Sequence, residues 1–309
     1  MSPVQDAPRF GRVITAMVTP FGDDGALDLE AAVELAHWLA AHGSDGLVLT
    51  GSTGESSVLT DDEKVALWRA VADAVTIPVI AGTGSNDTAH SVHMTTLAAT
   101  CGVDGVLVVT PYYNRPSQAG LFEHFRAVAE SAGDLPVVLY DIPVRSGRRI
   151  KTATMLRLAR EVPAIVALKD AAGDPATTAH LVAQAPAGFE VYSGDDVMTL
   201  PLLSIGAVGV ISVASHWVGP QFRRVIDAFL AGDLAAAVAG QAELLDSFDF
   251  ESSEEFPNPL PTKAILRALG LRVGQCRLPM GDATSELEAH AAKVLAAVGA
   301  PVVTVGALG

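Results

Sequence analysis

Ala164-Ile165-Val166-Ala167-Leu168 is a continuous apolar run that ends at a charged pair, Lys169-Asp170. A strand covered on both faces has this pattern, whereas a strand with one face in water alternates polar and apolar residues. Seven similar runs occur along the chain: Val13–Val18, Gly46–Leu49, Pro78–Ala81, Gly105–Val109, Pro136–Leu139, Phe189–Tyr192 and Ala207–Val213. The sequence therefore predicts eight buried strands.

Helices are expected between these strands, because successive runs begin 18 to 33 residues apart, and most of these spacings suit one strand-helix unit. Thr60 and Glu63 form a capping-box pattern at the start of one intervening segment. The apolar residues of that segment then recur at helical spacings of three and four: Val65, Trp68, Val71, Ala72 and Val75. The chain is thus predicted to alternate strands and helices.

Eight such units predict an α/β fold of the (β/α)8 barrel type, since right-handed crossovers leave few other closed arrangements. The alternative is an open doubly wound sheet, but no Gly-x-Gly-x-x-Gly follows the first run, as it would in a dinucleotide-binding sheet. Beyond Phe229 the strand pattern stops and helical spacing continues. We expect a catalytic barrel over residues 10–232 and a C-terminal helical region over residues 233–309.

Composition excludes several classes of protein. The 20 basic and 35 acidic residues give a net charge of −15, which disfavours nucleic acid as a partner. Half of the residues are hydrophobic, yet no apolar run reaches the roughly 18 residues of a membrane-spanning helix. The first ten residues lack the apolar core of a signal peptide, and the two cysteines cannot build a disulfide framework. We expect a soluble, cytoplasmic protein.

Lys169 is the most informative candidate, because active sites of such barrels lie at the C-terminal ends of the strands. The other four lysines lie in helical or polar surroundings, where solvated charges are expected: Lys64, Lys151, Lys263 and Lys293. Only Lys169 directly follows a buried strand. Two interpretations of Lys169 are possible. Its amine either forms a salt bridge with Asp170 or Asp195, or has a pKa lowered by desolvation and forms a Schiff base with a carbonyl substrate.

Polar residues at other strand ends favour the Schiff base. Tyr113 and Tyr140 are suited to deliver and remove the protons that this chemistry requires, whereas Tyr112 is assigned to packing at the rim. Ser52 and Thr53 lie on a glycine-rich turn, whose hydroxyl and N–H groups could hold a carboxylate.

Metal and cofactor chemistry find little support in the sequence. The eight histidines are scattered and form no His-Glu-x-x-His pattern. Asp195-Asp196 follows a strand where phosphate-binding barrels place amides and cations, which argues against a phosphorylated substrate. We expect an enzyme without metal or cofactor.

Seven motifs occur in a fixed order along the chain. They are Gly51-Ser52-Thr53-Gly54-Glu55, Tyr112-Tyr113-Asn114-Arg115-Pro116-Ser117-Gln118, Tyr140-Asp141-Ile142-Pro143-x-Arg145-Ser146-Gly147, Leu168-Lys169-Asp170-Ala171, Ser193-Gly194-Asp195-Asp196, Gly209-Val210-Ile211-Ser212 and Asn258-Pro259-Leu260-Pro261-x-Lys263. From about Val13 to Met280 the chain resembles the 4-hydroxy-tetrahydrodipicolinate (dihydrodipicolinate) synthases. These belong to the pyruvate-dependent class I aldolases, a family that also contains N-acetylneuraminate lyase.

This resemblance implies a role for each candidate residue. Lys169 would condense with pyruvate, and the resulting enamine would attack a short aldehyde, aspartate semialdehyde. Tyr140 would be the central acid and base, connected through Ser52 to Tyr113, which in the family reaches in from a partner subunit. The substrate-binding residues would be Thr53, Arg145, Gly194 and Ile211, the last through its carbonyl group. The family is usually a homotetramer, built as a dimer of tight dimers.

One position departs from the family pattern, since Ser52 replaces the threonine that is usual in the synthases and matches many sialate lyases. Arg145 favours the synthase, because a guanidinium suits a short carboxylate-bearing aldehyde better than a polyol chain. Two alternatives remain: an aldolase for a 2-keto-3-deoxy sugar acid or a related keto acid, and a non-catalytic barrel that binds a keto acid.

The resemblance also bears on regulation, because many synthases of this family bind L-lysine as a feedback inhibitor at the tight-dimer interface. The positions that correspond to the inhibitor site are Asp61, Lys64, Asn86 and His90. His90 replaces a glutamate that would hold the ammonium group of the inhibitor. The sequence therefore predicts weak or absent inhibition by lysine.

Overall fold

The computed structural model describes residues 7–299 and contains one closed barrel of eight parallel strands in the order β1 to β8. Each predicted run overlaps one strand, and four strands (β3, β5, β6 and β7) continue one or two residues past the end of their runs. The bounds are β1 (Val13–Ala16), β2 (Gly46–Leu49), β3 (Val79–Gly82), β4 (Gly105–Val109), β5 (Val137–Asp141), β6 (Ile165–Asp170), β7 (Glu190–Ser193) and β8 (Gly209–Ser212). The prediction of a (β/α)8 barrel is confirmed.

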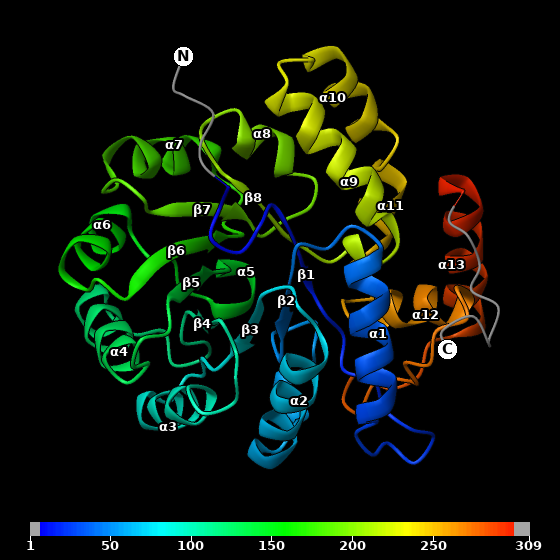
Figure 1. The fold of residues 1–309 in the computed structure, drawn as a ribbon, viewed down its shortest axis with the longest axis horizontal. Helices are drawn as coiled ribbons and strands as arrows, with labels where there is room; N and C mark the ends of the chain where they lie inside the picture. Colours follow the sequence, from blue (N-terminus) through cyan, green and yellow to red (C-terminus); the bar gives the residue numbers. More distant parts are fainter. Residues whose placement is uncertain (1–6, 300–309) are drawn as a thin grey trace.

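Helices surround the barrel and connect its strands (Figure 1). They are α1 (Leu29–Ala41), η1 (Ser56–Val58), α2 (Asp61–Ala74), α3 (Thr88–Ala98), α4 (Gln118–Glu130), α5 (Pro143–Ser146), α6 (Thr152–Glu161), α7 (Pro175–Gln184), α8 (Thr199–Leu203) and α9 (Ser215–Leu230). The capping box of α2 forms as predicted: Glu63 N–H donates to the Thr60 hydroxyl, and Thr60 N–H donates to the Glu63 carboxylate. Among residues 7–299, no helix has both the length and the apolar character needed to cross a bilayer.

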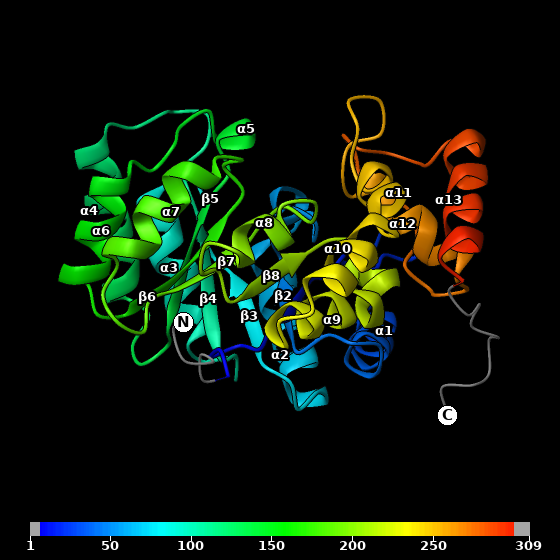
Figure 2. The same cartoon turned by 90° about the horizontal axis from the view of Figure 1, so that it is seen from above.

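The chain after the barrel is helical, as expected. Its elements are α10 (Leu234–Ala242), α11 (Leu245–Phe250), α12 (Leu260–Ala268) and α13 (Ser285–Val298). Helix α10 packs along α9, whereas α11, α12 and α13 gather at the end of the molecule opposite α4 and α6 (Figures 1 and 2). The boundary placed at residues 232 and 233 falls between α9 and α10 and stays a prediction.

Two layers of apolar side chains stabilise the barrel. The larger lies between the strands and the surrounding helices, and the smaller fills the barrel interior with inward-facing residues such as Ile14, Ile80 and Val138. Tyr140 of β5 belongs to this inner layer and pairs in register with Lys169 of β6. The strand pairing therefore brings these two side chains next to each other at the C-terminal end of the barrel.

Candidate active site

Lys169 is 5% exposed, and its amine makes no hydrogen bond or ion pair with the described part of the chain. Instead, its Nζ atom lies 4.4 Å from the centroid of the Tyr140 ring. Burial lowers the pKa of Lys169 to about 8, against the opposing effect of the Asp196 and Glu251 carboxylates. A buried amine with a lowered pKa and no partner is suited to nucleophilic attack. The alternative of a salt bridge to Asp170 or Asp195 is wrong.

Gly194 makes room for this lysine. A Cβ atom at position 194 would lie 2.9 Å from Cγ and 3.1 Å from Cε of Lys169, and both distances are too short for an ordinary contact. The Gly194 N–H donates to the Asp170 carbonyl, which fixes the loop after β7 beside the end of β6. Any larger residue at this position would therefore displace the Lys169 side chain.

Tyr140 lies in the same pocket with its phenol buried. Burial raises the pKa of Tyr140, an effect partly offset by the charge of Arg145 and by a hydrogen bond with Ser52. The hydroxyl therefore stays protonated at neutral pH and is available as a proton donor.

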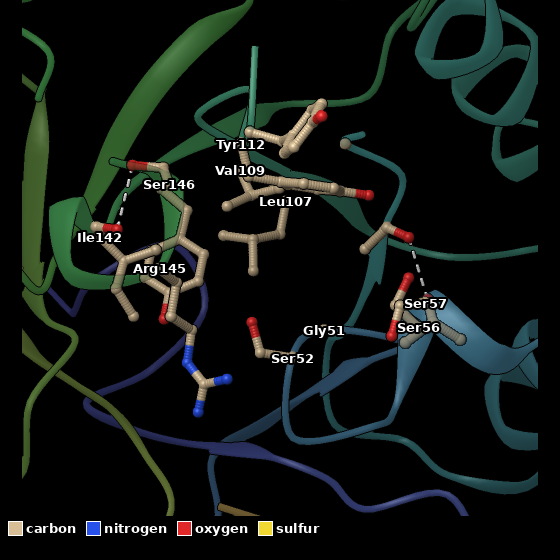
Figure 3. Close-up of a pocket in the computed structure, with 15 residues that line it drawn as sticks. Gly51, Ser52, Ser56, Ser57, Leu107, Val109, Tyr112, Ile142, Arg145 and Ser146 are labelled. Carbon is tan, nitrogen blue, oxygen red and sulfur yellow. Dashed lines mark hydrogen bonds between the residues drawn. The ribbon is translucent and has the colours of Figure 1, made fainter. Parts of the chain in front are cut away.

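Two adjoining cavities contain these groups. The inner cavity has a volume of about 430 Å³ and includes Lys169, Gly194 and Thr53 in its wall. The outer cavity has a volume of about 370 Å³ and includes Tyr112 and Tyr113. Both share a wall formed by Ser52, Tyr140, Arg145 and three further residues. Figure 3 shows Ser52 and Arg145 across from each other, with Tyr112 on another side.

Arg145 belongs to α5, the short helix that directly follows β5. Its Nη2 atom donates to the Asn258 carbonyl at 3.3 Å. The Asn258 side chain in turn donates to the Thr53 hydroxyl at 2.9 Å. Asn258 thus connects two predicted substrate-binding residues from a segment more than 100 residues away in the chain. Its role was not expected from the sequence, although it opens one of the seven motifs.

A buried ion pair stabilises the turn after β2. Lys263 Nζ lies 2.8 Å from the Glu55 carboxylate, and the two side chains are 1% and 2% exposed. Glu55 has a positive φ of 54° and also accepts a hydrogen bond from the Arg277 N–H. The expectation that Lys263 is a solvated charge is wrong, because α12 packs this side chain into the interior against the turn.

Lys64 requires a similar correction, since it is only 8% exposed and burial lowers its pKa. Lys151 and Lys293 are exposed, as expected.

Two predicted site residues contribute little to the cavity walls within one chain. Tyr113 borders the outer cavity, but its side chain is 89% exposed within one chain. Ile211 lies inside β8 and is buried in the barrel interior, and neither cavity wall includes its side chain. Among residues 7–299, no group of three or more His, Cys, Asp or Glu side chains is placed to hold a metal ion.

The fold and the chemistry at the ends of β5 and β6 define a class I lyase, an enzyme that forms a Schiff base between a lysine and its substrate. The chain belongs to the Dihydrodipicolinate synthetase family, whose model matches residues 9–298. This membership supports the synthase over the two alternatives considered from the sequence.

Individual relatives cover nearly the whole chain. The 4-hydroxy-tetrahydrodipicolinate synthase of Symbiobacterium thermophilum is 53% identical over 294 residues, which are 94% of this chain and 99% of that protein. The enzyme of the same name from Moorella thermoacetica is 49% identical over 295 residues, with the same two coverages. The crystal structure of dihydrodipicolinate synthase from Cyanidioschyzon merolae with lysine bound has a TM-score of 0.91 and 44% identity, and covers 94% of this chain and 98% of that one.

Proposed function

We propose that this protein is a 4-hydroxy-tetrahydrodipicolinate synthase, which condenses pyruvate with L-aspartate 4-semialdehyde in lysine and diaminopimelate biosynthesis. The observation that carries the proposal is the Lys169 amine, which is buried, has a lowered pKa and faces a cavity beside a protonated phenol. In the proposed reaction this amine attacks the keto carbon of pyruvate. The carbinolamine then loses water, and an imine forms.

The remaining steps use groups that border the same cavity. Loss of a proton from the pyruvate methyl group converts the imine into an enamine, whose carbon attacks the aldehyde. The amino group of the semialdehyde then displaces Lys169 from the imine, which closes the ring and restores the free amine. Tyr140 is assigned as the acid and base for these transfers, with Ser52 and Tyr113 as the path to solvent.

Arg145 and the turn after β2 are assigned to the two carboxylates of the substrates. The N–H groups of Ser52 and Thr53 donate no hydrogen bond within the described part of the chain, and both residues border the inner cavity. They are therefore free to hold the pyruvate carboxylate. Arg145 is assigned to the semialdehyde carboxylate, which it can bind through a charge-assisted pair. Gly194 and the Ile211 carbonyl complete the proposed pyruvate site.

We also propose that the protein is a cytoplasmic homotetramer, a dimer of tight dimers. Large exposed side chains at the two cavities support this assembly, since Tyr113 of the outer cavity and Val144 of the inner cavity are 89% and 87% exposed in a single chain. A partner subunit that covers Tyr113 would bring this hydroxyl into the proposed relay.

The experiment that tests the function combines trapping with turnover. Incubation with pyruvate and borohydride, followed by mass spectrometry, locates the adduct. Turnover is then compared between L-aspartate 4-semialdehyde and 2-keto-3-deoxy sugar acids. The proposal requires an adduct on Lys169 and turnover of the semialdehyde. Turnover of a sugar acid alone would contradict it.

Replacing Arg145 with alanine is expected to impair the semialdehyde step far more than adduct formation with pyruvate. Loss of a charge-assisted contact costs roughly 1.5–3 kcal/mol, so kcat/KM for the semialdehyde should fall about 10- to 150-fold. Steady-state kinetics and the rate of borohydride trapping measure the two steps separately.

Arg157→Ala, which removes an exposed guanidinium on α6, is the matched control and should change neither step. Arg145→Lys should restore part of the lost kcat/KM, because it keeps the charge but not the planar fork. Equal losses in both steps would assign Arg145 to structural support, through its bond to Asn258, and would weaken the proposal.

Inhibition by L-lysine is expected to be weak or absent. A third cavity of about 260 Å³ contains the four positions named from the sequence, Asp61, Lys64, Asn86 and His90. Nε2 of His90 lies 3.0 Å from both Asp61 oxygens, and Nζ of Lys64 lies 3.8 Å from the same carboxylate. The Asp61 carboxylate therefore already contacts His90 and Lys64, and it is not available to bind the ammonium group of an incoming lysine.

Steady-state kinetics at increasing concentrations of L-lysine measure the inhibition. The variant His90→Glu should bind lysine about 10- to 150-fold more tightly, because it adds a carboxylate worth roughly 1.5–3 kcal/mol in a charge-assisted bond. Half-inhibition of the unmodified enzyme by submillimolar lysine would contradict the prediction.

A further inference from the structure

Glu251 is a carboxyl group in the wall of the inner cavity that the proposed mechanism does not use. It is the first residue after α11 and therefore comes from the C-terminal helical region rather than from the barrel. Its neighbours in the wall include Lys169 and Asp195. A glutamate from outside the barrel is thus placed beside the proposed nucleophile.

The carboxyl group that faces Glu251 belongs to Asp196, in the loop after β7. One oxygen of Asp196, Oδ2, accepts three hydrogen bonds: from the Ser212 hydroxyl at 2.9 Å, the Val213 N–H at 3.0 Å and the Ala214 N–H at 2.7 Å. Three donors directed at a single oxygen hold this side chain in one orientation. The Asp196 carboxylate is therefore fixed near Lys169, and its charge raises the pKa of the amine.

One further oxygen of each side chain lacks a donor. Oδ1 of Asp196 and Oε2 of Glu251 are both buried without a hydrogen-bond donor among the described residues, although the two side chains are within hydrogen-bonding reach of each other. Two neighbouring buried carboxylates disfavour each other's ionised form, whereas a single proton between them replaces the repulsion with a hydrogen bond. A proton shared between the two side chains would satisfy both buried oxygens.

We propose that Glu251 is a protonated carboxylic acid that donates a hydrogen bond to Asp196. The two side chains together then carry a single negative charge near Lys169. This makes Glu251 a positioning residue, and the assignment rests on the proposed Schiff-base function of Lys169. Burial and the Asp196 carboxylate both raise the pKa of Glu251 well above its usual range, which is consistent with a proton held at neutral pH.

The proton on Glu251 matters because of its effect on the amine. The charged groups that act on Lys169 are Asp196 and Glu251, which raise its pKa when ionised, and Arg145, which lowers it. Asp195 lies next to the pair and disfavours a second ionisation there. When Glu251 is neutral, only one of these two carboxyl groups is charged and raises the pKa of Lys169. A larger fraction of the amine is then unprotonated and nucleophilic at neutral pH.

The test measures the pH dependence of adduct formation. Pyruvate is trapped on the full-length enzyme with cyanoborohydride across a pH series, and the midpoint of the rate profile reports the pKa of Lys169. Glu251→Gln keeps a neutral donor to Asp196, so its midpoint should move by no more than about 0.3 pH unit. Glu251→Ala leaves Oδ1 of Asp196 without a donor and admits water, so its midpoint should rise by about 0.5–1 unit.

Glu254→Gln, which removes an exposed carboxylate three residues further on, is the matched control and should leave the midpoint unchanged. A midpoint that falls by a unit or more in Glu251→Gln would show that Glu251 is ionised and would overturn the proposal. An unshifted midpoint in Glu251→Ala would overturn it as well. Thermal melts establish that each variant is folded.

A second readout separates this proposal from the proposed function. Infrared difference spectra at neutral pH should show a C=O stretch of a protonated carboxyl group that the unmodified enzyme and Glu254→Gln share and that Glu251→Gln lacks. The contribution of Asp141, whose pKa burial raises to about 7, is common to all three proteins and cancels in the difference. Absence of that band in the unmodified enzyme contradicts the shared proton, whatever the trapping shows. Absence of any adduct at any pH, with the band present, instead counts against the Schiff-base function.

Discussion

Lys169→Ala should abolish both the pyruvate adduct and turnover. The lysine amine is the group that bonds to the substrate, and alanine at this position has no atom to replace it. Among the described lysines, only Lys169 combines a lowered pKa with a place in the wall of either active-site cavity. Borohydride trapping and mass spectrometry measure the adduct, and a coupled assay measures turnover.

Two further variants sharpen this test. Lys169→Arg should not restore activity, because a guanidinium stays protonated and cannot attack a carbonyl. Lys151→Ala, at an exposed lysine, should label and turn over like the unmodified enzyme. The buried Lys263 should remain unlabelled, since it is paired with Glu55 and borders neither cavity. Label on Lys263, or none on the unmodified enzyme, would contradict the mechanism.

Tyr140→Phe should lower turnover by about 100-fold or more, which is the usual contribution of a general acid and base. Phenylalanine keeps the ring on which the Lys169 amine lies and removes only the hydroxyl. Because burial keeps that hydroxyl protonated, it can donate a proton to the carbinolamine oxygen. The expected signature is a large loss in kcat with the variant as stable as the parent.

Tyr192→Phe is the control for this variant. Tyr192 pairs in register with Lys169 on the other side, but its hydroxyl donates to Glu190 at 2.9 Å, at the start of β7. Removal of that hydroxyl should leave kcat within about threefold, because it lies at the opposite end of the strand from the site. A comparable loss in both variants, or a Tyr140→Phe enzyme that retains a third of the parent activity, would exclude the assigned role.

The central part of the site could be recognised from the sequence because it depends on local pattern. A lysine directly after five apolar residues is unusual wherever it occurs, and the ends of parallel strands meet at one face of a barrel. Tyr140 was found in the same way, as a phenol at the end of the preceding strand. Strand pairing then places the two side chains in contact.

The surroundings of that centre could not be recognised in this way. Lys263 was expected in water because its neighbours along the chain are helical, yet α12 packs it against Glu55, which precedes it by more than 200 residues. Asn258 and Glu251 reach the cavity for the same reason. The residue pattern of the C-terminal segment does not indicate which part of the barrel it packs against, and the pattern of the barrel does not indicate this either.

The order of apolar runs was sufficient to predict the barrel, because strand burial and right-handed connections are set by short-range chemistry and leave few closed arrangements. The same runs placed Lys169 and Tyr140 at the catalytic face. Only the tertiary structure decided which charges surround the lysine and which side chains support the turn after β2. Those contacts join the C-terminal helices to the barrel, and the pKa of a buried amine depends on every charge within a few ångströms, however distant in sequence.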